Sequence, residues 1–311
     1  MTLPACLFNG RKRRSVFSDM GYRIGVLDSG VGGLTVLAPM LGSMPMAEFI
    51  YYADNAWCPY GPREVEEVRS RVFSIVQGFV DSGCAMVVVA CNTATAAAIE
   101  ALRGAFSIPF VGMEPAVKPA ALQSVTHVIG VLATHGTIKG DRFQRQLEQY
   151  GQAVEIIQVE GEGLVEIVEQ RLCDTPMAER RVRELVGPMV ERGIDQLVLG
   201  CTHYPFLRGV FERVLPKGVT VVNPAVAVSR QAVRVYKSLR GVSPAQRLRG
   251  GSLLLVSSGG DASLRRRLEE YLHVSGNELA VVGELSEVTP QALADGVRGC
   301  ETRGKWQFRC R

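Results

Sequence analysis

Residues 87–98 read VVVACNTATAAA, and residues 197–207 read LVLGCTHYPFL. Each stretch begins with an apolar run that ends at a cysteine, Cys91 in the first and Cys201 in the second, and polar residues follow at once. A continuous apolar run is typical of a strand in a parallel sheet whose two faces are covered by helices. The two stretches therefore predict two buried parallel strands, each of which presents a cysteine at its carboxyl end.

Short apolar runs alternate with segments of helical periodicity along most of the chain. In residues 64–82 apolar side chains recur at spacings of three and four, which predicts a helix, and we expect further helices at 34–41 and 95–106. Strands are expected near the following segments: 23–27, 49–53, 86–90, 109–112, 127–132, 154–159, 196–199, 219–222 and 252–256. This order predicts the α/β class, with mostly parallel sheets flanked by helices.

Two segments recur in the same order along the chain. IGVLDS at 24–29 resembles IGVLAT at 129–134, and VVAC at 88–91 resembles VLGC at 198–201. A duplicated α/β unit would explain both matches and predicts two pseudo-symmetric domains; chance similarity among apolar strands is the alternative. Ligands of open α/β sheets bind beyond the carboxyl ends of the strands, so we expect the active site in the cleft between the domains.

The domain assignment follows from these repeats and from composition. Residues 22–113 plus 225–285 are assigned to the first α/β domain, and residues 114–224 to the second. Residues 1–21 and 286–311 are polar and are expected to be flexible tails.

The composition limits the classes of partner. The 311 residues carry a formal net charge of only +4, and much of it lies in the run RKRR at 11–14. We interpret that run as a solvated tail, with contact to an anionic partner as the alternative, and nucleic-acid binding by the body of the chain is not supported. No apolar run approaches the roughly 18 residues of a membrane span, and no signal peptide opens the chain. We therefore expect a soluble, cytoplasmic protein without a membrane partner.

The cysteine pattern argues for reduced thiols. Eight cysteines occur at irregular spacing, with no CxxC, which is not the pattern of a disulfide framework. A cysteine at a strand end is most simply a small buried hydrophobe. Cys91 and Cys201 differ from the others because each lies where a strand gives way to an expected helix, whose N–H groups could stabilise a thiolate. The remaining cysteines, Cys58 among them, are interpreted as structural or incidental.

Acids and one histidine accompany these two thiols. Asp28 and Asp54 end the first two strands, where each could cap a turn or instead exchange a proton with a nearby thiol. His203 lies two residues from Cys201 and could orient or deprotonate it. A zinc site at Cys201 and His203 would need Cys91 as a third ligand, so we expect no metal.

The glycines and hydroxyl groups point to a small substrate. The turn at 30–33 reads GVGG, which lacks the spacing of a dinucleotide fingerprint, and no GxxxxGK[ST] occurs, so neither nicotinamide nor nucleotide triphosphate use is supported. Hydroxyl and amide side chains converge on the expected cleft, where they would suit carboxylates, although each could also be a cap or turn residue. These side chains are Ser29, Asn92, Thr93, Thr134, Thr137 and Thr202.

Six segments together resemble the glutamate racemases of the cofactor-independent aspartate/glutamate racemase family. They are LDSGVGGLTVL, YYADNAWCPYGPR, VVVACNTATA, VGMEPAVKPA, LATHGTI and LVLGCTHYPFL. The resemblance runs from about residue 23 to about residue 240, and the combination of CNTATA with GCTHYP is more specific than any single motif.

The resemblance implies a mechanism and its residues. In this family two cysteines on opposite faces of the substrate Cα exchange its proton, without pyridoxal phosphate or another cofactor. Carried over, the two are Cys91 and Cys201, whose roles as thiolate base and thiol acid swap with the hand of the substrate. Asp28 would assist the first thiol and His203 the second.

Further site residues come from the same resemblance. Asp54 would contribute electrostatically, and Glu169 falls at an acid that the family places near the second cysteine. Many members carry a threonine where this chain has Asn55, which puts a substrate contact there in doubt. Substrate binding is implied for the following residues: Asp28, Ser29, Tyr60, Gly61, Asn92, Thr93, Thr202 and His203.

The implied role is D-glutamate supply for bacterial peptidoglycan. Members with an N-terminal extension can be activated by a UDP-muramoyl-alanine precursor, which residues 1–21 raise as a question for this chain, and the family includes homodimers. One alternative is racemisation of aspartate or another amino acid. The other is a dual-role protein that also binds and inhibits DNA gyrase, for which the RKRR run is the one supporting feature.

Overall fold

The computed structural model describes residues 22–239 and 252–259, together with positions 264, 266, 267, 270 and 293. The predictions for the RKRR run, for both tails and for most of the segment 260–285 lie outside these described residues. None of the helices within 22–239 combines the length and the apolar character needed to cross a membrane.

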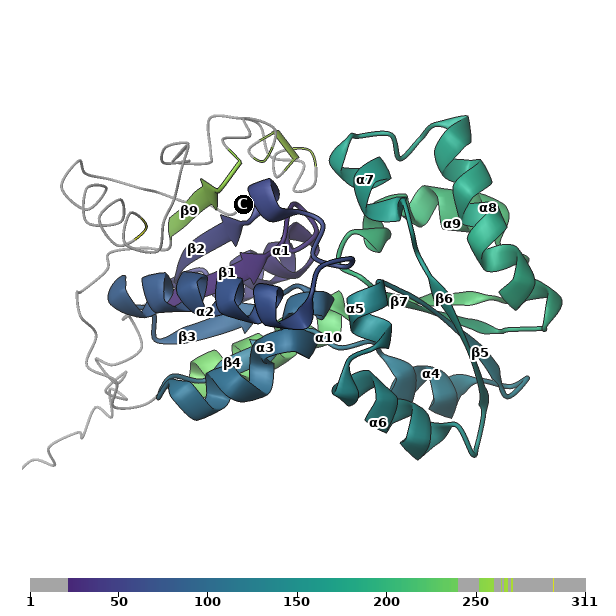
Figure 1. Cartoon of the computed structure of the whole chain (residues 1–311), viewed down its shortest axis with the longest axis horizontal. Coiled ribbons are helices and arrows are strands. Elements are labelled where there is room, and N and C mark those ends of the chain that lie inside the picture. Colours follow the sequence, from purple (N-terminus) through teal and green to yellow (C-terminus); the bar gives the residue numbers. More distant parts are fainter. Residues whose placement is uncertain are drawn as a thin grey trace, which may run out of the picture.

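The first sheet is entirely parallel and has the strand order β4–β3–β1–β2–β9. It places β1 at its centre, and the last strand of the described chain, β9, at its edge (Figure 1). Its strands are β1 (Arg23–Asp28), β2 (Glu48–Ala53), β3 (Met86–Val89), β4 (Phe110–Gly112) and β9 (Ser252–Ser257).

The second sheet repeats this arrangement. Its order is β6–β5–β7–β8, again all parallel, so β5 takes the place of β1 and β7 takes the place of β3. Leu27 pairs with Val89 in the first sheet, and Leu132 pairs with Leu199 in the second, which are the positions that the sequence repeat equates. The predicted α/β class with two pseudo-symmetric parallel sheets is confirmed. The strands are β5 (Val128–Ala133), β6 (Glu155–Glu160), β7 (Gln196–Gly200) and β8 (Thr220–Val222).

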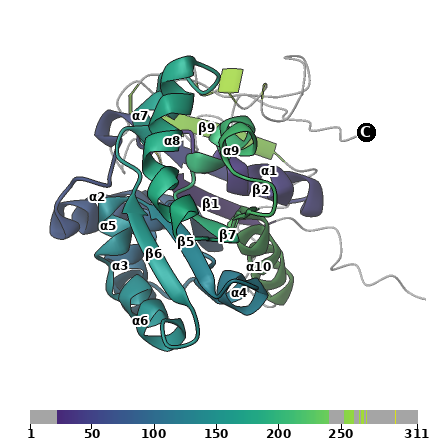
Figure 2. The same cartoon turned by 90° about the vertical axis from the view of Figure 1, so that its right-hand side faces the viewer.

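Helices cover the sheets and also cross between the two halves. The helix α10 follows β8 of the second sheet but packs against α1 and β4 of the first, while α4 follows β4 and packs against β5 and β7. Figure 1 shows the two halves side by side, and Figure 2 views the molecule from the side of the second half, with β5 and β6 toward the viewer. The helices are α1 (Leu34–Ser43), α2 (Val65–Asp81), α3 (Asn92–Ala105), α4 (Val117–Gln123), α5 (His135–Ile138), α6 (Asp141–Tyr150), α7 (Leu164–Glu169), α8 (Pro176–Glu191), α9 (Arg208–Val214) and α10 (Ala225–Ser238), with 3₁₀ turns η2 (Asn55–Trp57) and η3 (Tyr204–Leu207).

Burial of both sheet faces explains the continuous apolar runs. In β1, Ile24 and Val26 belong to one hydrophobic cluster and Leu27 belongs to another, and all three are fully buried. A strand with two buried faces cannot alternate apolar and polar residues, as the sequence of β3 also indicates.

Polar contacts join the two halves at the carboxyl ends of their strands. The Thr202 hydroxyl, beyond β7, donates to the Asp28 carboxylate at the end of β1. The Thr93 and Thr134 hydroxyls hydrogen-bond each other at 2.8 Å, and the Gly136 amide donates to the Gly61 carbonyl. The polar ends of the two sheets therefore meet, and the candidate site lies where they meet.

Candidate active site

Asp28 lies at the centre of the junction. Its carboxylate is fully buried; Oδ1 accepts from the Gly30 amide and Oδ2 from the Thr202 hydroxyl, both at 2.9 Å. Burial raises the pKa of Asp28 above its ordinary value, and the charge of His203 with these two hydrogen bonds offsets part of the rise. A carboxyl group whose pKa is raised exchanges a proton more readily than an ordinary aspartate does.

Cys91 ends β3 and caps the helix that follows. Its sulfur accepts from the Ala94 amide at 3.5 Å and lies 3.8 Å from the Ser29 hydroxyl. The helix α3 therefore begins at Asn92, earlier than the predicted residue 95, because the cysteine itself supplies the cap. Burial, followed by the charge of Asp28, raises the pKa of Cys91 to about 12.

Cys201 occupies the equivalent place after β7 but has different support. A turn and the 3₁₀ segment η3 precede α9, so no helix begins at Cys201, and the expectation of a helix N-terminus there is wrong. The imidazole of His203 is its partner instead, with Nδ1 3.8 Å from the sulfur. The charge of Cys201 contributes to the raised pKa of Cys91, which places the two thiols within electrostatic range of each other.

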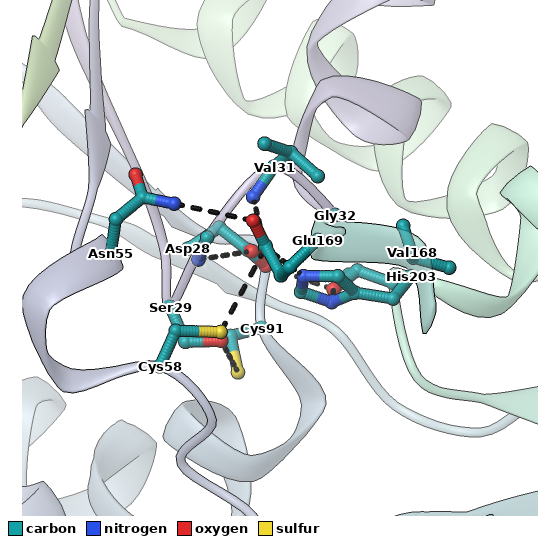
Figure 3. A network of polar contacts seen from close by, with 12 residues as sticks. Asp28, Ser29, Val31, Gly32, Asn55, Cys58, Cys91, Val168, Glu169 and His203 are labelled. Atoms are coloured by element: carbon teal, nitrogen blue, oxygen red, sulfur yellow. Dashed lines mark hydrogen bonds and ion pairs between the residues drawn. The ribbon is translucent and has the colours of Figure 1, made fainter. Parts of the chain in front are cut away.

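His203 and Glu169 form a buried ion pair. His203 Nε2 lies 2.6 Å from Glu169 Oε1, and their side chains are 1% and 19% exposed (Figure 3). Burial alone would lower the pKa of His203, but contacts with two cysteine sulfurs and with Glu169 outweigh it and raise the pKa well above 6.5. Burial alone would raise the pKa of Glu169, but His203 outweighs it and lowers the pKa. The imidazolium is therefore held beside Cys201.

The Gly-rich turn after β1 allows this ion pair to pack against Asp28. A Cβ at Gly30 would lie 2.0 Å from Glu169 Oε1, and one at Gly32 would lie 2.4 Å from Thr202 Oγ1 and 2.5 Å from His203 Nδ1. Absence of a side chain at both positions lets the backbone approach closely. These glycines thus make room for side chains of the other half.

Asp54 is bound within its own half. Arg71 donates to both carboxylate oxygens, at 2.7 and 2.9 Å, and the Tyr60 hydroxyl donates to Oδ2 at 2.6 Å. Arg71 also lies over the Trp57 ring, 5.1 Å from its centroid. The charge of Asp54 is therefore balanced by Arg71, and the hydroxyl of Tyr60 is occupied by Asp54.

Hydroxyl groups and one amide complete the junction. The Thr134 hydroxyl hydrogen-bonds both Thr93 and Thr137 at 2.8 Å, which brings together three of the groups expected to converge. Asn92 is 3% exposed, and among the described residues neither its amide nitrogen nor its oxygen has a hydrogen-bond partner. A buried amide without partners is costly unless a ligand satisfies it.

Comparison with known proteins identifies this architecture. Residues 37–232 match the family described as Asp/Glu/Hydantoin racemase. The chain belongs to the Asp/Glu/hydantoin racemase family. The glutamate racemase of Herpetosiphon aurantiacus is 41% identical over 239 residues, which cover 77% of this chain and 93% of that one. The glutamate racemase of Methylococcus capsulatus is 43% identical over 213 residues, 68% of this chain and 79% of that one.

Solved racemase structures share the fold. A glutamate racemase isoform from Bacillus anthracis superposes with a TM-score of 0.73 at 33% identity, covering 86% of this chain and 99% of that one. The Escherichia coli glutamate racemase, solved with L-glutamate and the activator UDP-MurNAc-Ala, has a TM-score of 0.72 at 29% identity, covering 85% of this chain and all of that one. The protein is therefore an amino-acid racemase, an isomerase.

Two residues lie beside the Glu169–His203 ion pair that the sequence did not assign to the site. Cys58 was missed, and Asn55 was left in doubt. Cys58 had been set aside as structural or incidental, but its sulfur lies 3.8 Å from Glu169 Oε1. The Asn55 amide nitrogen donates to the other oxygen of the same carboxylate, Oε2, at 3.4 Å. The Asn55 side chain therefore contacts Glu169. Within the described part of the chain, Cys58, Glu169 and His203 are the three residues placed to hold a metal. The sequence signal available for Cys58 was its position two residues before Tyr60, which the resemblance assigns to substrate binding.

Proposed function

We propose that this racemase interconverts L- and D-glutamate by proton transfer between two thiols and the substrate Cα, without a cofactor. The observation that carries the proposal is the placement of Cys91 and Cys201 at corresponding ends of β3 and β7, one from each half. Inversion at carbon needs an acceptor on one face and a donor on the other. A pseudo-symmetric pair of sheets supplies one thiol from each side.

Cys91 is proposed as the base for one enantiomer, with Asp28 as its proton partner. The raised pKa of this thiol, about 12, makes its thiolate the stronger base toward a weakly acidic Cα proton. The α-ammonium of a bound amino acid would favour that thiolate electrostatically. Asp28, whose pKa is also raised and whose charge acts on Cys91, is proposed to receive the thiol proton.

Cys201 is proposed as the opposite acid or base, with His203 as its partner. The His203 imidazolium lies 3.8 Å from the sulfur and can stabilise a thiolate or return a proton to it. Glu169 holds the ring from the other side at 2.6 Å and keeps it charged. With the other enantiomer the direction of transfer reverses, so each thiol serves in turn as acid and base.

Substrate binding is proposed for the polar groups around the two thiols. The unpartnered amide of Asn92 suits a carboxylate through its nitrogen and an ammonium through its oxygen. Ser29, Thr93 and Thr202 add hydroxyls. The Tyr60 side chain is fixed by the bond from its hydroxyl to Asp54, and the Gly61 carbonyl accepts from the Gly136 amide. Fixed donors in a site shielded from water are what carbanion formation requires. The names of the most similar relatives favour glutamate over aspartate as substrate.

The proposed role is supply of D-glutamate for peptidoglycan in the bacterial cytoplasm. The E. coli relative was solved with UDP-MurNAc-Ala as activator, which makes this precursor the candidate activator here. Activation would be tested by adding the precursor to the full chain and to a variant that begins at Met20.

Deuterium incorporation tests the function directly. L-glutamate incubated with the purified protein in D₂O, without added cofactor, is expected to give D-glutamate that carries deuterium at Cα, measured by chiral chromatography and mass spectrometry. A panel with aspartate decides between the amino-acid substrates. Folded protein that leaves both L-glutamate and L-aspartate unchanged would refute the proposal.

Single cysteine variants test the two-thiol assignment. Cys91→Ser and Cys201→Ser are each expected to lower racemisation by at least the roughly 10²–10⁴-fold typical of a lost general acid or base. Each variant should retain exchange of one enantiomer more than of the other. Cys84→Ser is the matched control because Cys84 is also buried but precedes β3, at the opposite end of that strand from Cys91, with Arg23 and Glu48 as the charges near it. Racemase activity in Cys91→Ser and Cys201→Ser as high as in Cys84→Ser would contradict the assignment.

A further inference from the structure

Three side chains beside the proposed catalytic thiols have the composition of a metal site. One ligand atom from each of Cys58, Glu169 and His203 lies within 4.8 Å of the other two. They come from distant parts of the chain: the loop that follows η2, the end of α7, and the turn after β7. Figure 3 shows the Glu169 carboxylate between the Cys58 sulfur and the His203 ring.

We propose that Cys58, Glu169 and His203 form a binding site for one Zn²⁺ ion, which inhibits the enzyme by occupying His203. A thiolate, an imidazole and a carboxylate are the donors that Zn²⁺ takes in proteins, and three protein ligands with an open fourth position are typical of accessible zinc sites. Mg²⁺ and Ca²⁺ prefer sets made only of oxygen, so this mixed set selects against them.

The distances are close to those of a zinc complex. Zinc bonds of about 2.0–2.3 Å in a tetrahedron separate neighbouring ligand atoms by roughly 3.3–3.7 Å. Cys58 Sγ and Glu169 Oε1 are 3.8 Å apart, and the Cys58 sulfur also contacts the imidazole. The 2.6 Å contact between Glu169 and His203 must open by about 0.7 Å to admit the ion. The ion then replaces the proton that the pair now shares.

Outer contacts already orient two of the ligands. The Val31 amide donates to Glu169 Oε1 at 2.9 Å, and the Asn55 amide lies 3.4 Å from Oε2. With Nε2 of His203 bound to the ion, Nδ1 keeps its hydrogen toward Cys201 and Thr202, as metal-bound imidazoles commonly do. These contacts therefore orient the Glu169 carboxylate and the His203 ring toward the position that the ion would occupy.

The ion can reach the site and would block the reaction. Cys58 and Glu169 are partly exposed, whereas His203 is buried. On binding, the thiol proton of Cys58 and the Nε2 proton of His203 leave for solvent, and a Zn–S and a Zn–N bond form. The imidazole can then no longer carry a positive charge beside Cys201. This consequence rests on the proposed racemase mechanism, while the binding itself does not.

A titration with Co²⁺, a spectroscopic stand-in for Zn²⁺, tests the site in the full chain without substrate. We expect one Co²⁺ per chain, with a thiolate-to-metal charge-transfer band that Zn²⁺ abolishes by displacement. Cys58→Ser should lose the band and bind at least 10-fold more weakly. Glu169→Gln should keep the band but also bind at least 10-fold more weakly. Cys84→Ser and Cys201→Ser should bind as wild type does. Far-UV circular dichroism checks that each variant is folded.

Two outcomes would overturn the proposal. Retention of the band in Cys58→Ser would exclude this set of ligands, and its loss in Cys201→Ser would place the ion between the catalytic thiols.

Inhibition is tested separately. With L-glutamate as substrate, Zn²⁺ should inhibit wild type reversibly, with recovery on addition of EDTA. The inhibitory concentration should rise at least 10-fold in Cys58→Ser, measured against the metal-free rate of that variant. Metal binding without racemase activity would refute the proposed function and leave the site standing.

Discussion

Replacement of Arg71 by methionine should destabilise the protein through the carboxylate that it leaves behind. Asp54 is fully buried and Arg71 is 20% exposed, so the substitution leaves a buried charge without its cation. Breaking a buried ion pair costs about 3–5 kcal/mol, and the partial exposure of Arg71 favours the lower end of that range. We therefore expect Arg71→Met to lower the free energy of unfolding by about 3 kcal/mol.

Arg63→Met is the matched control. Arg63 lies over the same Trp57 ring, 4.7 Å from its centroid, and donates to the Trp57 carbonyl, but its carboxylate partner is the exposed Glu67. The lost ion pair is worth about 0.3–0.5 kcal/mol at such a site, the ring contact about 0.5–1 kcal/mol and the hydrogen bond about 1 kcal/mol. Arg71→Met also loses a contact with this ring, so the two variants differ chiefly in the buried carboxylate. The Arg63→Met variant should therefore be more stable than the Arg71→Met variant.

The sign of a second substitution distinguishes the cause. Asp54→Asn should destabilise the Arg63→Met protein, since it weakens the pair with Arg71. In the Arg71→Met background it should instead recover about 1–2 kcal/mol, because it removes the buried charge. Urea unfolding followed by far-UV circular dichroism measures both effects; with an m value of about 3 kcal/mol/M, 3 kcal/mol shifts the midpoint by about 1 M. Further destabilisation of Arg71→Met by Asp54→Asn would refute the reasoning.

Two further predictions concern the site itself. Gly32→Ala should lower kcat/KM about 100-fold, because its Cβ would displace Thr202 and His203, whereas Gly42→Ala, with nothing within 4 Å, should leave activity unchanged; equal rates in the two variants would count against the close approach. The pKa of Glu169 is lowered, so its stabilising contribution is present above pH 4.5 and is lost as the pH falls through its folded value. The pKa of His203 is raised, so its contribution is present below pH 6.5 and is lost as the pH rises through its folded value. The stability advantage of wild type over Glu169→Gln should therefore be greatest between pH 4.5 and 6.5, and an advantage that grows steadily with pH would contradict the ion pair.

Features that depend on neighbours along the chain were predictable from the sequence. The apolar run before Cys91 requires a strand with two buried faces, and the polar residues after it allow a helix to start at once. The repeat equated Leu27 with Leu132 and Val89 with Leu199, and those residues pair in the same way in the two sheets. The nearness of His203 to Cys201 follows from their separation by one residue.

Features that depend on contacts between distant segments were not predictable. Asp54 ends a strand as Asp28 does, yet Arg71 on α2 neutralises it, while Asp28 receives a hydroxyl from the opposite half. The two cysteines also diverge: a helix begins directly after Cys91, but a turn and the 3₁₀ segment η3 follow Cys201. Sequence similarity between their segments concealed that difference.

The sequence by itself determined that two apolar strands each end in a thiol, because strand burial and helix capping are local matters of residue pattern. Tertiary structure decided which charges surround each thiol. Glu169, which only the family resemblance suggested, becomes the partner of His203 because α7 and the turn after β7 meet beyond the sheet. Cys58 joins them from a third segment. Electrostatic energy depends on separation in space, and the folding of the two halves against each other sets that separation.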